Sequence, residues 1–189
     1  MKQIQVKDIM VPVSEYATVY EDASLYEALL VLEKSKILFQ QNKDRHKAIL
    51  IKSRANDRVM GKMGQLDVIR VLEPKYETIF EQTPLSKFGL GREFMDIMMD
   101  HYKLWDESLG TICRTMGRVK VSDLMYTPTE GECVNANDNL SKAVHQLVMG
   151  HHQGLLVMDG TEIVGILRLS DVFDEVCSIM KSELKTGSE

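Results

Sequence analysis

The sequence predicts an α/β (α+β) fold in which two βαββα units pack as a pseudo-twofold pair, with a helical insert between them. Three observations predict it. Four sequence blocks recur in the same order, the strand and helix patterns around them agree between the copies, and an amphipathic stretch separates the copies. The repeats are taken first because a repeated unit decides the architecture of the whole chain.

The two copies share a short opening pattern. Val6-Lys-Asp-Ile-Met10 resembles Val121-Ser-Asp-Leu-Met125, and the offset of 115 residues holds into the first helix of each copy. Three later blocks match at offsets of 106 and 104 residues, so the first copy carries extra residues before its central strand. These blocks pair 46–51 with 152–157, 59–61 with 163–165 and 66–68 with 170–172. Four matched blocks in one order indicate a duplicated unit.

Local patterns give each unit the same order of strand, helix, strand, strand and helix. Ser24 is typical of a helix start, because its side chain accepts a free amide proton of the first turn. Leu25, Leu29 and Leu32 then fall on one predicted helical face. Gly160 follows an aspartate between two apolar runs and predicts a tight hairpin turn, since glycine tolerates positive φ.

The predicted boundaries are 1–74 for the first unit, 75–118 for the insert, 119–181 for the second unit and 182–189 for a tail. Within the insert, apolar residues recur at steps of three and four, which predicts an amphipathic helix that 105–108 or Gly110 splits in two. The residues of this stripe are Phe94, Met98, Tyr102, Trp105, Leu109, Ile112 and Met116. Two interpretations stay open: the stripe packs on its own chain, or it forms the surface for a second copy or another partner.

Composition and motifs exclude several classes of function. The net charge of −5 argues against binding to a nucleic acid duplex, which needs clustered positive charge. No apolar run is long enough for a membrane span, and the first residues lack the apolar core of a signal peptide, so a cytoplasmic location is expected. No nucleophile elbow, phosphate loop or metal-ligand spacing is present. We therefore predict no enzyme activity, no catalytic residues and no metal site.

The repeated blocks resemble the CBS domain, named after cystathionine β-synthase, and the tandem arrangement resembles a Bateman module. The family pattern ends in G-h-h-[ST]-x-x-D, where h is apolar, and here it is matched by 61–67 and 165–171. The resemblance covers about 6–73 and 119–181. It implies a regulatory module whose clefts bind an adenosine-containing ligand such as AMP, ADP or ATP, and it implies association into a homodimer.

The resemblance implies that the motif aspartates, Asp67 and Asp171, bind the ribose hydroxyls, because a carboxylate readily accepts hydrogen bonds from two neighbouring hydroxyls. The alternative is that each aspartate caps the last helix of its unit. Gly64 and Arg168 stand where the family has the Ser or Thr that helps to hold phosphate. Arg168 either meets phosphate through a charge-assisted fork or fills the site itself. Two unequal sites are therefore expected.

Further residues match family positions near the base or the phosphates. They are Thr18, His46, Lys47, Ala48, Lys62, Cys133, His152 and Gly154. For Lys47 and Lys62 the alternative is a solvated side chain.

Taken together, the sequence predicts a stand-alone CBS-pair sensor that binds an adenine nucleotide and acts through a homodimer or an unknown regulated protein. The alternative is a ligand-independent scaffold for dimerisation or protein interaction.

Overall fold

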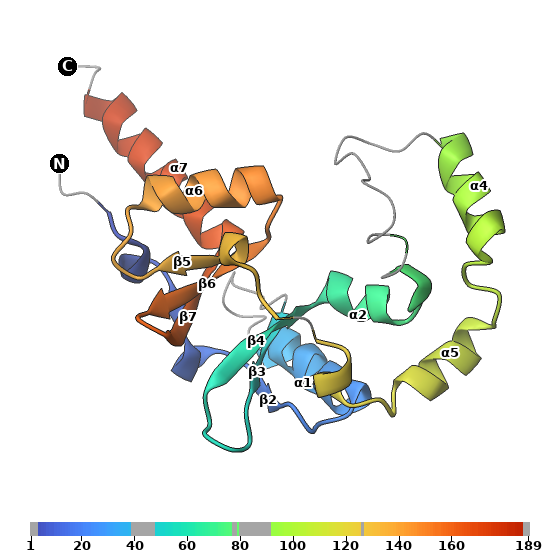
Figure 1. Ribbon diagram of the computed structural model, residues 1–189. Helices are drawn as coiled ribbons and strands as arrows, with labels where there is room; N and C mark the ends of the chain where they lie inside the picture. The colour runs from blue at the N-terminus through green and yellow to red at the C-terminus, as the bar shows by residue number, and fades with distance from the viewer. Residues whose placement is uncertain (1–3, 39–47, 77–78, 80–91, 126, 187–189) are drawn as a thin grey trace.

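The computed structural model describes residues 4–38, 48–76, 79, 92–125 and 127–186. It contains two βαββα units, as the sequence predicts, set side by side (Figure 1). Repeat 1 consists of β2 (Thr18–Tyr20), α1 (Leu25–Leu38), β3 (Ala48–Lys52), β4 (Val59–Gly64) and α2 (Gln65–Val71). Repeat 2 consists of β5 (Cys133–Asn135), α6 (Leu140–Gly150), β6 (Gly154–Asp159), β7 (Glu162–Arg168) and α7 (Leu169–Thr186).

Each repeat has its own sheet, and the two sheets have matching topology. The first has the order β2-β3-β4, and the second has the order β1-β7-β6-β5, in which β1 is Val11–Pro12. In both, the short first strand runs parallel to the central strand, and the hairpin strand runs antiparallel to it. Gly160 has a φ of +58°, which is the left-handed conformation that the predicted hairpin turn requires.

Helix α1 buries a slightly different face from the predicted one. Leu25, Ala28 and Leu32 are the residues that contact the core of repeat 1. Leu29, which was expected on this face, is 36% exposed and lies at its edge. The small side chain of Ala28 lets the helix lie close to the sheet, so the buried stripe turns toward it and away from Leu29.

The opening segments of the two repeats are exchanged. Val6 is fully buried in the core of repeat 2, and its amide donates to the carbonyl of Asp138 at 3.0 Å. Val121 is fully buried in the core of repeat 1, and its amide donates to the carbonyl of Ala23 at 2.8 Å. These bonds are related by the sequence offset of the repeats. Each opening segment therefore completes the core of the other repeat, which ties the two units into one body.

A third apolar cluster lies between the sheets. Leu50 and Leu156 occupy equivalent positions on the two central strands, and both are fully buried in this cluster. Tyr16 and Ile166 complete its buried part. The contact between the repeats is thus apolar at its centre.

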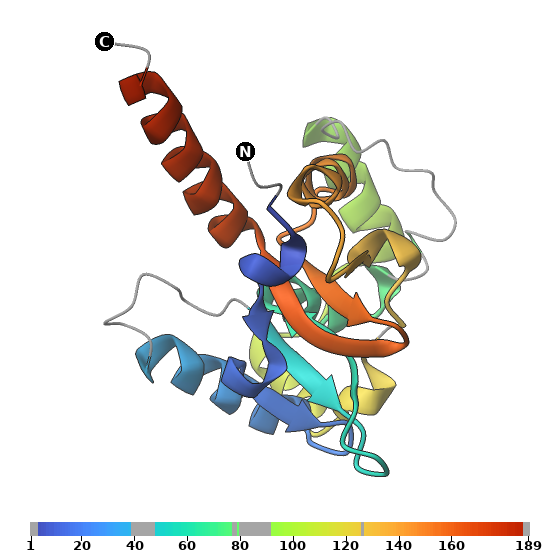
Figure 2. The ribbon, with the colours of Figure 1, turned by 90° about the vertical axis from the view of Figure 1, so that its left-hand side faces the viewer.

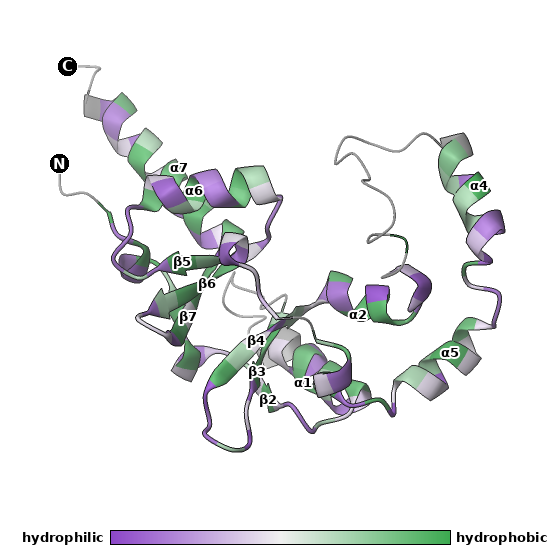
Figure 3. Ribbon diagram, in the orientation of Figure 1, coloured by the Kyte–Doolittle hydropathy of each residue, from purple (hydrophilic) through white to green (hydrophobic). Residues whose placement is uncertain are grey.

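From residue 92 onward the insert consists of helices α4 (Arg92–Tyr102) and α5 (Leu109–Met116), which arc away from the repeats (Figures 1 and 3). The expected break falls at 103–108, and Gly110 lies inside α5. Glu73, only 5% exposed, anchors this break by accepting from the amide of Trp105 at 2.6 Å. The indole nitrogen of Trp105 also donates to the hydroxyl of Tyr76 at 3.0 Å. These bonds hold the left-handed backbone of Trp105, whose φ is +60°.

Helix α7 continues well beyond the repeat and projects past the N-terminal segment (Figure 2). None of the helices in the described part of the chain has both the length and the apolar character that crossing a bilayer requires.

Candidate functional site

The strand registers bring the predicted site residues together in pairs. Ala48 is the Cα partner of Gly64 in repeat 1, and Gly154 is the Cα partner of Arg168 in repeat 2. Both pairs lie at the start of the central strand, where the hairpin strand leads into the last helix. The two candidate sites are therefore equivalent in backbone position and differ in the side chains that they present.

In repeat 1, Asp67 holds the start of α2 and keeps one oxygen for other partners. Its Oδ2 accepts from the amide of Gly64 at 2.8 Å, which is the capping role that the sequence left open. Its Oδ1 lies 4.0 Å from Nη1 of Arg70 and accepts no hydrogen bond from a described residue. The Asp67 side chain is 22% exposed, about twice the exposure of its equivalent in repeat 2.

In repeat 2, the equivalent aspartate is bound by an arginine side chain. Nε of Arg168 donates to Oδ2 of Asp171 at 2.7 Å, and Nη2 donates to Oδ1 at 2.5 Å. The two side chains are only 10% and 11% exposed. This is a bidentate pair in a largely water-free position, the geometry in which an arginine–carboxylate bond is strongest.

Tyr16 belongs to the electrostatic surroundings of this pair, although it was not among the site residues predicted from sequence. Burial raises the pKa of the Tyr16 hydroxyl to about 12, while the charge of Arg168 lowers this pKa and the charge of Asp171 raises it. Its ring is 7% exposed and lies in the cluster between the sheets. A residue of the segment before β2 therefore lies beside the site of repeat 2.

Lys62 makes an ion pair across the two repeats. Its Nζ lies 3.0 Å from Oε1 of Glu132, and the two side chains are 15% and 8% exposed. Glu132 also caps a short turn by accepting from the amide of Thr129 at 3.2 Å. Cys133 follows this glutamate; burial raises the pKa of its thiol, Glu132 raises it further, and Lys62 lowers it.

Other predicted site residues are spread around these groups. Thr18 opens β2 and is half-buried, in register with Leu50 of the central strand. The ring of His152 packs against Gly150 at the end of α6, where a β-carbon on the glycine would lie 2.1 Å from it. His46 and Lys47 lie outside the described residues.

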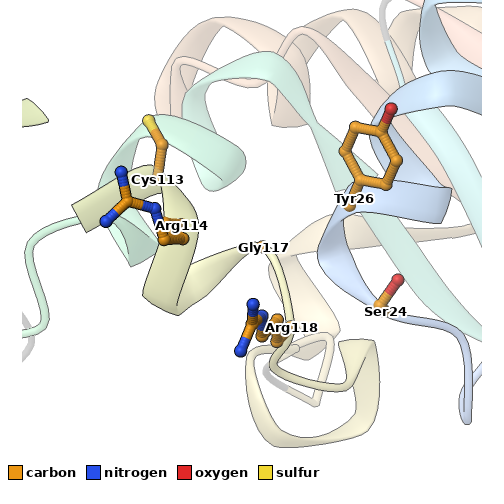
Figure 4. Close-up of a pocket in the computed structure, with 6 residues that line it drawn as sticks. All are labelled: Ser24, Tyr26, Cys113, Arg114, Gly117 and Arg118. Carbon is orange, nitrogen blue, oxygen red and sulfur yellow. The ribbon is translucent and has the colours of Figure 1, made fainter. Parts of the chain in front are cut away.

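Neither of two hollows found among the described residues is lined by a predicted site residue. One, of about 480 Å³, lies between the start of α1 and the end of α5 (Figure 4). Its lining residues are Ser24, Tyr26, Cys113, Arg114, Gly117 and Arg118. The other, of about 180 Å³, lies by the two hairpin turns. In the part of the chain that the structure describes, no group of three or more His, Cys, Asp or Glu residues is placed to hold a metal ion.

Comparison with known proteins agrees with this arrangement. The family model of the CBS domain matches residues 121–178, within repeat 2. CBSX2, solved in complex with AMP, is 19% identical, with a TM-score of 0.58, over 93% of this chain and 98% of that one. This chain has the fold of a tandem CBS-domain protein. A search of the curated proteins finds no match.

Two further solved structures resemble this chain in fold. A CBS domain-containing protein of unknown function from Bacillus anthracis is 17% identical, with a TM-score of 0.60, over 94% of this chain and 95% of that one. The CBS domain of a bacterial CNNM/CorC family Mg²⁺ transporter, solved with ATP, is 16% identical, with a TM-score of 0.53, over 92% of this chain and 87% of that one. At these identities the likeness shows the fold.

Two features of the site were missed from sequence, and one of them had a signal. By the repeat offset of 115 residues, Tyr16 corresponds to Gly131. The offset therefore pairs a large side chain in one copy with a glycine in the other, and this difference was the signal. The partnership of Lys62 with Glu132 had no such signal, because 70 residues separate them.

Proposed function

We propose that this CBS pair is a regulatory module that binds an adenosine-containing nucleotide at Asp67 of repeat 1. Asp67 carries the proposal, because a backbone amide fixes one carboxylate oxygen while the side chain as a whole stays 22% exposed. An oxygen fixed in this way is suited to accept from a ribose hydroxyl. The relatives solved with AMP and with ATP support an adenine nucleotide as the ligand class.

The surroundings of Asp67 suit a flat base and a sugar. Gly64 has no side chain, and its Cα partner Ala48 has only a methyl group, so no bulky side chain covers the backbone where β3 begins and β4 ends. Thr18 begins the neighbouring strand of the same sheet. A purine packed against this backbone would place its ribose toward α2. We propose no catalytic step, since a regulatory module needs only to bind and release its ligand.

Asp67→Asn is expected to weaken nucleotide binding about tenfold or more, because a hydrogen bond to a charged acceptor contributes about 1.5–3 kcal/mol. Asparagine still has a carbonyl oxygen for the Gly64 amide, so α2 keeps its cap. Titration calorimetry with AMP, ADP and ATP, extended to S-adenosylmethionine and cyclic dinucleotides, measures the effect.

The matched control is Asp8→Asn. Asp8 accepts from the amide of Gln5 at 2.9 Å, three residues before it, as Asp67 does from Gly64, but at the opening segment. Its replacement should leave nucleotide affinity unchanged. Absence of heat and of a thermal shift with every nucleotide tested would sink the proposal.

A second candidate, a scaffold for association with a second copy of the chain, is favoured by the exposed apolar side chains of α4. Phe94 is 42% exposed and Ile97 is 63% exposed, on a helix that stands away from the repeats (Figure 3). The insert is anchored at Trp105, which holds this helix in a defined place. An apolar helix presented in this way suits an interface.

On this candidate, the double variant Phe94→Ser, Ile97→Ser should convert a dimer to a monomer in sedimentation velocity, at unchanged secondary structure. Val148 and Met149 on α6 are each 63% exposed and provide the matched control, because the same double replacement there removes as much exposed apolar side chain. Equal masses for the wild-type chain and the α4 variant would count against the scaffold.

A further inference from the structure

The two candidate sites share a backbone but differ in what occupies them. Gly64 and Arg168 are equivalent residues, each paired with the first residue of its central strand. Asp67 and Asp171 follow three residues later. In repeat 1 the aspartate bonds to a backbone amide of its own turn, whereas in repeat 2 the aspartate bonds to a guanidinium.

The guanidinium takes both oxygens of Asp171 at once. Its two nitrogens lie 2.7 and 2.5 Å from the two carboxylate oxygens, so the edge that would receive a ribose diol already carries two donors. Arg168 thus supplies the same pair of donors to Asp171 that two adjacent hydroxyls would supply. It is an internal substitute for the sugar.

Burial makes this substitute hard to displace. The side chains of Arg168 and Asp171 are 10% and 11% exposed, against 22% for Asp67. A ligand that removed Arg168 from Asp171 would leave a buried guanidinium without its counter-ion, a larger loss than two neutral hydroxyl donors restore.

A residue beside each site also differs in size between the two repeats. Tyr16, buried beside the Arg168–Asp171 pair, corresponds by the repeat offset to Gly131. Gly131 is exposed, and a β-carbon there would meet only Oγ1 of Thr129, at 3.8 Å. The site of repeat 2 therefore has Arg168 and Tyr16 beside it, and the residues equivalent to these two are both glycines, Gly64 and Gly131.

We propose that Arg168 closes the site of repeat 2 as a built-in counter-ion for Asp171, so that the chain takes one nucleotide, at repeat 1. The stoichiometry rests on the proposed function. The closure itself does not, because it concerns the access of solvent and reagents to Asp171.

Carboxylate labelling tests the closure without a nucleotide. In the native chain, carbodiimide with glycine ethyl ester should label Asp67 about tenfold faster than Asp171, as read by peptide mass spectrometry, because a buried bidentate pair shields both oxygens. Arg168→Gly should raise the labelling of Asp171 to the level of Asp67. The reciprocal variant, Gly64→Arg, should lower the labelling of Asp67. Labelling of Asp171 at the rate of Asp67 in the native chain would overturn the closure.

Equilibrium dialysis with AMP and ATP tests the stoichiometry. One nucleotide per chain is expected, bound about tenfold or more weakly in Asp67→Asn and with unchanged affinity in Asp171→Asn. Two per chain, or one that depends on Asp171, would overturn the inference and leave nucleotide binding in place. No binding at all would overturn the proposed function, while the labelling rates still decide the closure. If Arg168→Gly does not fold, the closure is decided by the ratio of Asp67 to Asp171 labelling in the native chain and in Arg168→Lys. The lysine keeps the positive charge and loses the two-pronged hydrogen bonding of the guanidinium.

Discussion

Replacing Lys62 by methionine is expected to lower the free energy of unfolding by about 3 kcal/mol, although the side-chain volume is nearly kept. Lys62 and Glu132 lie 3.0 Å apart between the two repeats, and both are largely buried. Removing the ammonium leaves the Glu132 carboxylate in a site that water reaches poorly. Urea unfolding followed by circular dichroism measures the loss.

The double variant Lys62→Met, Glu132→Gln should recover most of this stability, because it removes both charges together. Glutamine keeps a carbonyl oxygen for the amide of Thr129, so the turn before β5 retains its cap. The other half of the molecule gives a precedent: the residues at the equivalent positions are Ile166 and Ala17, and Ile166 is buried in the apolar cluster between the sheets. A double variant as unstable as the sum of the two single variants would contradict this explanation.

The thiol of Cys133 provides an independent measure of the same pair. Burial raises its pKa most, Glu132 raises it further, and Lys62 lowers it. In Lys62→Met, alkylation of Cys133 near the ordinary thiol pKa of 9.0 should therefore be slower than in the native chain, since less thiolate is present. The double variant should restore the rate, while Cys113 and Cys177 serve as internal controls.

The duplicated fold was predictable from sequence because its signals are local. The helix start at Ser24, the hairpin at Gly160 and the apolar strands each lie within a few residues of one another, and the repeat offset supplied the same evidence twice. The order β2-α1-β3-β4-α2 and its copy are confirmed by the structure. Leu29 shows the limit of such patterns, because a helical stripe is wide and the sheet decides which edge is buried.

The exchange of the opening segments was not predictable from sequence. Val6 and Val121 have the same apolar pattern around them, and either one fits the core of its own repeat or of the other. The choice depends on where the following residues lead the chain, which is a property of the assembled sheets. The same holds for Glu73 and Trp105, because the carboxylate that holds the break in the insert lies 32 residues away.

For the candidate site, residues could be proposed from the sequence, but their side-chain partners could not. Asp67 and Asp171 occupy equivalent positions and differ because Gly64 has no side chain whereas Arg168 folds back on its own turn. An arginine three residues before an aspartate is compatible with a free phosphate-binding fork or with an internal pair. Here the burial of Arg168 and Asp171 beside Tyr16 favours the internal pair. That burial depends on the other repeat, which supplies Tyr16.

The exchange itself leads to the second large prediction, at Gly165. β1 pairs with β7 so closely that a β-carbon on Gly165 would lie 2.6 Å from the carbonyl oxygen of Val11 and 3.0 Å from Sδ of Met10. The carbonyl belongs to a strand whose next residue is Pro12, with its φ fixed by the ring, so it has little freedom to move. Gly165→Ala should therefore lower the free energy of unfolding by about 2 kcal/mol, as expected for overpacking.

Gly61→Ala is the matched control, because Gly61 is the equivalent residue in repeat 1. Its β-carbon would meet only side chains, with Cε of Met125 nearest at 3.1 Å, and this flexible end can move aside. Its cost should stay below about 1 kcal/mol. Hydrogen exchange locates the difference: in Gly165→Ala the amides of Val6 and Lys7, which bond to repeat 2, should exchange faster, while in Gly61→Ala they should not. Equal loss of stability in the two variants would mean that the backbone of β1 yields as readily as a methionine side chain, and that the exchanged segment is held by its apolar contacts rather than by its strand pairing.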